Sequence, residues 1–344
     1  MSALAQPCDV PVGGRQHCQL RSGLVSAGVL SVLVGGLVLA IPGLGAVGQR
    51  VGHAHWAWIV LGGALELASC LGYVLAFQTI FSEVPRRFGM MVAAAEQAFG
   101  AVVPVGGAGG IAAGGWLLSR AGMPLRAIGQ RSAVLFLLTS ATNVLTLVVA
   151  GAGLAVGLFA GPRAFLLSTV PAGVGLAVLL LFVVLAVRAR SPGRGEARSS
   201  RSARALRLTA GASADTLRAI RRPGGRLAIG AAAFLLCDIA VLWLAIHSLG
   251  YDVPVAPLLL AYLIGYLANT IPIPGGVGVL DGGLAGALIL YHVPAPVALS
   301  GVLIYHCLAL WIPALSGTLG FVAAQREISS GGVRIEAPPA RTGA

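Results

Sequence analysis

Two short segments rich in glycine and proline interrupt hydrophobic stretches of this chain, and both could expose backbone groups for binding. The residues of the breaks are Pro104, Gly106, Gly107 and Gly109 in the first segment and Asn269, Pro272, Pro274, Gly275, Gly276 and Gly278 in the second. Pro lacks an amide donor and Gly costs backbone entropy, so neither segment continues as a regular helix. Such breaks, in corresponding positions of two halves, are typical of the binding site of a membrane transporter. We therefore predict that these residues line a substrate site.

Ionisable side chains are energetically costly to place inside a membrane, so those in hydrophobic segments are candidates for functional residues. Asp281 follows the second break, where its carboxylate either caps exposed amides or binds a cationic headgroup or a coupling proton. Glu96 precedes the first break by roughly two helical turns and is predicted to face Asp281. His306 is either a core histidine or a proton relay to Asp281. Glu66 and Asp238 are predicted to be structural, bonding to the broken backbone.

No pattern of catalytic, metal-binding or cofactor-binding residues accompanies these candidates. His53 and His55 form an H-x-H pair, but two ligands do not make a metal site. The glycines have no βαβ context, so they are no dinucleotide signature. We predict no catalytic residue, no metal and no cofactor.

The composition is that of a polytopic membrane protein. The chain is 57% hydrophobic and 10% charged, against roughly 25% charged residues in a soluble domain. All 23 basic residues are Arg, and many lie in one segment, 188–226. This distribution indicates membrane orientation and excludes a nucleic-acid groove.

The hydrophobic pattern predicts an all-α membrane domain over 24–322, with six full spans and two broken re-entrant hairpins at about 88–118 and 256–292. The predicted spans are 24–47, 56–80, 132–160, 164–187, 227–249 and 297–322. The tail 1–23 and a disordered tail 323–344 complete the chain. Because cytoplasmic loops carry an excess of Arg, both tails and the Arg-rich linker 188–226 are predicted to be cytoplasmic. The hairpins then enter the membrane from opposite sides.

An internal repeat supports the same topology. Three pairs of landmarks have a nearly constant separation: Glu66 and Asp238 (172), Gly107 and Gly276 (169), and Pro124 and Pro294 (170). We predict two repeat units, 56–160 and 227–322, of inverted topology.

The second half resembles the lysylphosphatidylglycerol synthase transmembrane-region family of flippase-like proteins. The resemblance rests on the motif from Pro272 to Asp281, on Val293-Pro294 and on the segment from Leu303 to Pro313. The first half fits more loosely, from Pro104 to Gly109 and from Trp116 to Pro124. This chain has Asp281 where the family usually has Glu, and His306 where it often has Arg.

The resemblance implies movement of a phospholipid or a polyprenyl-linked lipid between the leaflets of a bacterial plasma membrane. No aminoacyl-transferase domain follows the membrane region, so we do not expect an enzyme. Expected partners are membrane lipids and a separate lipid-modifying enzyme, with no nucleic acid. The alternatives are a polyprenyl-dependent glycosyltransferase and a scaffold for a separate transferase.

Overall fold

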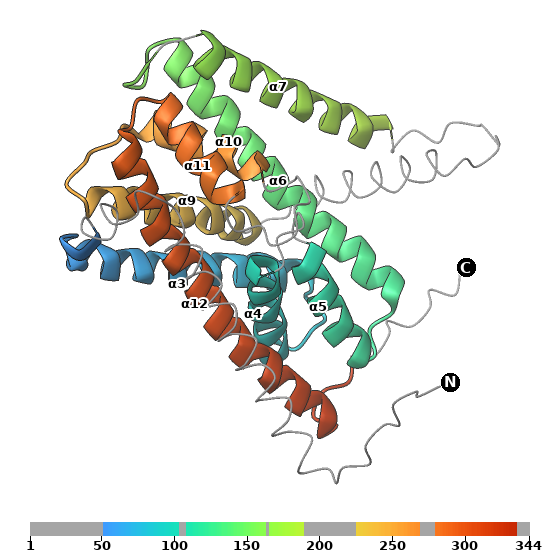
Figure 1. Ribbon diagram of the computed structural model, residues 1–344. Coiled ribbons are helices and arrows are strands. Elements are labelled where there is room, and N and C mark those ends of the chain that lie inside the picture. The colour runs from blue at the N-terminus through green and yellow to red at the C-terminus, as the bar shows by residue number, and fades with distance from the viewer. Residues whose placement is uncertain (1–50, 103–107, 163–164, 189–224, 269–278, 336–344) are drawn as a thin grey trace, which may run out of the picture. The chain divides into compact units, whose positions relative to one another are not determined.

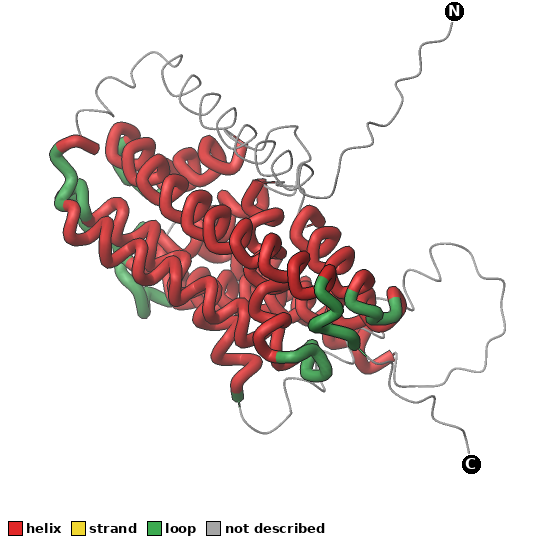
Figure 2. The backbone as a smooth tube through the Cα atoms, turned by 90° about the horizontal axis from the view of Figure 1, so that it is seen from below, coloured by secondary structure: helices red, strands yellow, loops and turns green. Residues whose placement is uncertain are grey.

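The computed structural model describes residues 51–102, 108–162, 165–188, 225–268 and 279–335 (Figures 1 and 2). Within these ranges the regular elements are α-helices. In chain order they are α3 (Trp56–Ile80), α4 (Arg86–Val102), α5 (Ala108–Arg120), α6 (Leu125–Ala155), α7 (Phe165–Arg188), α9 (Arg226–His247), α10 (Val255–Ala268), α11 (Val279–Leu290) and α12 (Ala295–Ser329). The predicted tail 1–23, the predicted span 24–47 and linker residues 189–224 lie outside the described residues.

Within the described ranges, five helices are long and apolar enough to cross a membrane: α3, α6, α7, α9 and α12. Three of them coincide with the predicted spans 56–80, 164–187 and 227–249 to within two residues. The chain is therefore an all-α, multi-pass membrane protein.

The other two long helices begin earlier than the sequence pattern predicted. Helix α6 begins at Leu125 rather than residue 132, and α12 begins at Ala295 rather than residue 297. Each follows a proline N-cap, Pro124 or Pro294, that already has extended backbone angles (ψ of 133° and 132°). Arg126 and Arg131, predicted to lie in a loop, therefore belong to the first turns of α6.

Each predicted broken segment consists of two short helices that pack against each other. Helices α4 and α5 form the first hairpin, and α10 and α11 form the second. Glycine permits the close approach, since a Cβ on Gly265 of α10 would lie 2.7 Å from the Cα of Leu284 in α11. The breaks themselves, residues 103–107 and 269–278, lie outside the described residues.

The helices of the two halves repeat with a constant offset. Trp56 and Arg226 begin α3 and α9, Arg120 and Leu290 end α5 and α11, and Leu125 and Ala295 begin α6 and α12. Each of these pairs is 170 residues apart. The element order is therefore the same in both halves: a spanning helix, a hairpin and a long helix.

The turns that follow the two hairpins have the same pattern of backbone hydrogen bonds. In the first turn the Gly122 amide donates to Ser119 and the Met123 amide to Leu118, both through backbone carbonyls. In the second turn His292 and Val293 donate to the matching carbonyls of Ile289 and Leu288.

The two halves meet through α3 and α9, which run antiparallel. Gly62 of α3 faces Leu244 of α9 near one end of the contact, and Gly72 faces Gly230 near the other. Because these helices are equivalent elements of the repeat, their antiparallel contact relates the halves by inversion.

At the Gly72 end of this contact the two backbones touch. A Cβ on Gly72 would lie 2.7 Å from the Phe234 amide nitrogen, and one on Gly230 would lie 2.8 Å from the Gly72 carbonyl oxygen. Small residues commonly allow helices to approach this closely in membranes. The Ser69 hydroxyl adds a hydrogen bond of 2.8 Å to the Phe234 carbonyl.

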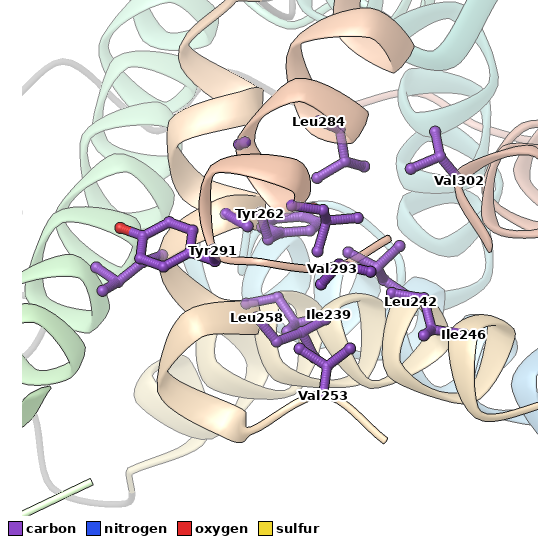
Figure 3. Packing of buried hydrophobic residues seen from close by; sticks show 14 of the residues in the cluster. Ile239, Leu242, Ile246, Val253, Leu258, Tyr262, Leu284, Tyr291, Val293 and Val302 are labelled. Carbon is purple, nitrogen blue, oxygen red and sulfur yellow. The ribbon is translucent and has the colours of Figure 1, made fainter. Parts of the chain in front are cut away.

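One hydrophobic core joins α9 to the second hairpin and to α12 (Figure 3). Ile239 and Leu242 of α9 meet Leu258 and Tyr262 of α10 and Val293 of the turn. Helix α7 packs beside α6, as Figure 1 shows, and most of its surface is exposed. An exposed apolar helix of this length is suited to contact with lipid.

The C-terminal part of the chain is more ordered than the sequence pattern predicted. Helix α12 continues to Ser329, beyond the predicted boundary at residue 322. The Ile335 amide then donates to the Ala121 carbonyl at 2.8 Å, and the side chains of Val333 and Ile335 are buried. The prediction of a disordered tail from residue 323 is therefore wrong for residues 323–335, since apolar side chains anchor this segment to the turn after α5.

Candidate functional site

Two carboxyl groups meet where the two halves of the protein pack together. Glu66 lies on α3 and Asp238 lies on α9, and their side chains share a hydrogen bond. Glu66 is only 4% exposed, and its Oε2 has no hydrogen-bond partner among the described residues. Each half therefore contributes one acid to a polar centre inside a bundle of apolar helices.

Two tyrosines from other helices complete this centre. The Tyr262 hydroxyl of α10 donates to Oδ2 of Asp238. The Tyr305 hydroxyl of α12 lies 3.1 Å from the same oxygen and 3.2 Å from Oδ1. Both tyrosines are buried, and a buried phenol needs such a partner for its hydroxyl. We call Glu66, Asp238, Tyr262 and Tyr305 the carboxyl–tyrosine centre.

A second polar contact ties the first hairpin to its own spanning helix. The Tyr73 hydroxyl of α3 donates to Oε2 of Glu96 on α4 at 2.7 Å. Glu96 is 4% exposed, and its Oε1 has no partner in the described part of the chain. The carboxyl group also fills the space beside Gly114 of α5, where a Cβ would overlap it. Glu96 therefore links its own helix, α4, to the spanning helix α3 and to the returning helix α5.

The structure describes four of the predicted site residues. Glu96 is buried, as expected of a functional acid, and His306 is half-buried next to Tyr305 on α12. Gly109 is the second residue of α5, so it belongs to the returning helix and not to the break. Asp281 is the third residue of α11, as predicted for a position near the start of that helix, and its side chain lies outside the description.

The other predicted site residues lie in the two breaks, outside the described residues: Pro104, Gly106, Gly107, Asn269, Pro272, Pro274, Gly275, Gly276 and Gly278. The predicted approach of Glu96 to Asp281, and the relay from His306 to Asp281, therefore stay predictions.

Sequence reasoning placed Glu66 and Asp238 in equivalent positions but did not place them in the site. It assigned them to the broken backbone, whereas the structure pairs them with each other and with tyrosine hydroxyls. It also did not single out Tyr73, Tyr262 or Tyr305. The available signal was the phenol itself, because a tyrosine inside a spanning segment needs a polar partner.

The described ion pairs lie away from these buried acids. Arg131 of α6 pairs with Glu83 in the loop before α4, and Nδ1 of His247 lies 2.6 Å from Oδ1 of Asp252. The carboxyl–tyrosine centre instead consists of oxygen atoms that accept or donate hydrogen bonds. Chemically, such a group of oxygens can bind a proton or a cation, or receive a polar headgroup.

A comparison with known protein families matches residues 27–317 to the family described as the lysylphosphatidylglycerol synthase TM region. The match includes both hairpins, the spanning helices of both repeats and all four residues of the carboxyl–tyrosine centre. The chain belongs to the lysylphosphatidylglycerol synthase TM region family. No curated protein matches the chain at a significant level.

Membership of this family confirms the resemblance found in the sequence and identifies a membrane protein connected with lipids. The match spans both halves, although the first-half motif resembled the family only loosely. The family therefore applies to the whole repeat architecture and not only to the second hairpin.

Proposed function

We propose that this protein moves a phospholipid or a polyprenyl-linked lipid between the two leaflets of a membrane. The observation that carries the proposal is the carboxyl–tyrosine centre, in which polar groups from both repeats meet inside apolar helices. Buried ionisable groups of this kind are expensive in a membrane and usually lie on a substrate or ion pathway. A passing headgroup needs such polar partners, while the acyl chains stay in lipid.

The two hairpins supply the second support for transport. Each consists of two short helices joined through a break rich in glycine and proline, and inverted repeats with broken helices are a common transporter design. Half-helix ends at a break leave amides and carbonyls free for a polar ligand. In this proposal the breaks bind the headgroup, together with Glu96, Asp281 and His306.

We also propose that the protein resides in a bacterial plasma membrane with both termini in the cytoplasm. The support comes from the Arg distribution, because the segments that carry most Arg then lie on one side. With this orientation the first hairpin opens toward the cytoplasm and the second toward the outside.

Two rival functions remain distinct and testable. A polyprenyl-dependent glycosyltransferase would turn over a lipid-linked sugar, and a scaffold would act only together with a separate lipid-modifying transferase. We favour transport without catalysis because two of the described buried acids, Glu96 and Asp238, bond to tyrosines of the bundle. A glycosyltransferase would instead use its acids as bases or metal ligands facing water.

The test is lipid movement by the purified full-length protein in liposomes. Vesicles of phosphatidylglycerol and phosphatidylethanolamine contain a trace of fluorescent phosphatidylglycerol, and a membrane-impermeant quencher reports the fraction of label in the outer leaflet. Transport predicts that wild-type protein exposes nearly all of the label, whereas protein-free vesicles expose about half. The same assay with a fluorescent polyprenyl phosphate distinguishes the two lipid classes.

The matched variants are Asp238→Asn and Glu83→Gln. Asp238→Asn removes the charge of the centre and keeps the size of the side chain. If headgroups pass the centre, this variant should slow lipid movement by about tenfold or more, because one lost hydrogen bond to a charged group is worth ~1.5–3 kcal/mol. Glu83→Gln changes an acid that is paired with Arg131 outside the centre, and it should leave the rate unchanged. Equal rates for wild type, Asp238→Asn and empty vesicles would contradict transport and favour the scaffold.

A further inference from the structure

The Glu66–Asp238 pair has a chemical property that lipid binding does not explain. An ionised carboxylate has only acceptor oxygens, so a hydrogen bond between two carboxyl groups requires a proton on one of them. The two side chains share such a bond at the contact between α3 and α9. The contact between the two repeats therefore requires one proton on this pair of acids.

The two acids differ in their surroundings, and the difference assigns a role to each. Asp238 accepts hydrogen bonds from Tyr262 and Tyr305, so its oxygens already act as acceptors. Glu66 is buried, and its Oε2 has no partner among the described residues although the side chain points at Asp238. Glu66 is thus the proton carrier, and Asp238 is the group that receives its hydrogen bond.

The other ionisable groups on the packed helices leave this assignment intact. On α3 and α9 the neighbours are the thiols Cys70 and Cys237, and on α10 they are Tyr262 and Tyr266. On α4, Glu96 is bound by Tyr73.

The remaining helices packed against α3 and α9 include α12 and α6. On α12, His306 follows Tyr305 in the sequence. On α6 the ionisable side chains are Arg126 and Arg131, both in the first two turns. The ion pairs in the described part of the chain, Arg131 with Glu83 and His247 with Asp252, do not include the two acids, and the bond between two carboxyl groups itself requires a proton.

We propose that Glu66 and Asp238 form a proton-binding site whose occupancy controls the contact between the two repeats. When the proton is present, one hydrogen bond joins α3 to α9. When the proton leaves to water, two carboxylates face each other in a poorly solvated place and repel. Their repulsion favours separation of the helices that join the repeats, and this is the motion that alternating access needs.

A coupling role follows, and it rests on the proposed lipid movement. A proton that binds from one side and leaves on the other makes the direction of transport depend on the proton gradient. A single coupled proton changes the ratio of forward to backward rates by up to about tenfold per pH unit.

Infrared spectroscopy of the full-length protein in detergent tests the site without any lipid assay. A pH titration should reveal the C=O band of a protonated carboxyl group that appears as the pH falls. Glu66→Gln should remove this band, and Glu83→Gln, which changes an acid outside the centre, should leave it in place. Tyr305→Phe, which deletes one donor to Asp238 and keeps the ring, should move the midpoint of the titration.

Two results would overturn the proton site. One is a titrating band that is identical in wild type, Glu66→Gln and Tyr305→Phe. The other is a band that responds to added NaCl at constant pH but not to pH itself, which would indicate a sodium site.

The coupling is measured in liposomes with an imposed pH gradient. Wild-type protein should move fluorescent phosphatidylglycerol preferentially in one direction, and Glu66→Gln should lose this preference. An equal dependence on the gradient in both proteins would overturn coupling through this pair. If wild-type protein moves no lipid at all, the proposed function and its coupling fail, while the infrared titration still decides whether the pair binds a proton.

Discussion

The two hairpins are held to their own spanning helices by the same kind of bond with the partners exchanged. In the first repeat the acid is on the hairpin and the tyrosine on the spanning helix, Glu96 and Tyr73, which are 23 residues apart. In the second repeat the tyrosine is on the hairpin and the acid on the spanning helix, Tyr262 and Asp238, which are 24 residues apart. Both repeats thus have a tyrosine–carboxyl hydrogen bond between the hairpin and the spanning helix, but the tyrosine that donates it lies on a different element in each.

The exchange has a consequence for the site. Because the second acid lies on the spanning helix, it also reaches Glu66 of the other repeat and Tyr305 of α12. Glu96 lies on a hairpin helix, and its hydrogen bond to Tyr73 and its close approach to Gly114 both stay within the first repeat. The acid of the second repeat, Asp238, therefore joins the two repeats, whereas the acid of the first repeat, Glu96, holds its hairpin to its own spanning helix.

The largest expected effect comes from breaking the contact between the repeats. Gly72→Leu puts a side chain against the backbone of Phe234 and Gly230, and backbone cannot move aside as a side chain can. We expect a loss of about 3 kcal/mol or more in stability, seen as loss of the monodisperse peak in size-exclusion chromatography. Gly173→Leu is the control, since a Cβ at Gly173 meets nothing within 4 Å. Equal behaviour of the two variants would contradict the close contact of α3 with α9.

A smaller effect compares the returning helices of the two hairpins. Gly114→Ala should destabilise the protein by about 2 kcal/mol, because its methyl group overlaps the buried Glu96 carboxyl. Gly282→Ala in α11 should be neutral or stabilise by about 0.5 kcal/mol, since the space there is open and Ala favours helix. Thermal unfolding in detergent measures both. A tolerated Gly114→Ala would show that Glu96 does not fill the first hairpin.

Substitutions in the turns after the two hairpins should change the stability by less. Gly122 and His292 both have left-handed backbone angles, with φ of 97° and 68°. Gly122→Ala should cost about 1 kcal/mol because a Cβ is strained in this region, and His292→Gly should stabilise by about 0.5 kcal/mol for the same reason. Thermal unfolding of both variants tests the equivalence of the turns. An unchanged or raised stability of Gly122→Ala, or a loss of stability in His292→Gly, would contradict the match between the repeats at this point.

The smallest effects come from the two exchanged bonds. Tyr73→Phe should cost about 0.6 kcal/mol, a usual value for a hydrogen bond between membrane helices. Tyr262→Phe should cost less, because Asp238 keeps its bond to Tyr305, whereas Tyr73→Phe removes the bond that Tyr73 donates to Glu96. Thermal unfolding of the two variants beside wild type gives the ranking. A larger loss for Tyr262→Phe would show that Tyr305 does not replace it.

Much of the fold could be predicted from the sequence because membrane helices are dictated by long apolar runs and by prolines. The spans at α3, α7 and α9, the two-helix character of both hairpins and the repeat all followed from such signals. The ends of α6 and α12 were misjudged where Arg126 and Arg326 extend helices beyond the apolar run, since charge at a helix end is tolerated outside the hydrocarbon.

The site was only partly predictable, since partners distant in sequence depend on how helices pack. Glu96 was identified as a buried acid from its type and place alone. The pairing of Glu66 with Asp238 depends on the antiparallel contact of α3 with α9, which Gly72 and Gly230 make possible. The predicted roles of the residues in the breaks lie outside the described residues and stay predictions.

The most direct test of the account is a scan of single cysteines through the two breaks, 104–109 and 272–281, in a protein whose five native cysteines are replaced. The central claim is that two hairpins enter the membrane from opposite sides around a shared polar centre. The account predicts that membrane-impermeant maleimide labels the first break only from the cytoplasmic side and the second only from the outside. Labelling of both breaks from one side, or of neither from any side, would contradict it.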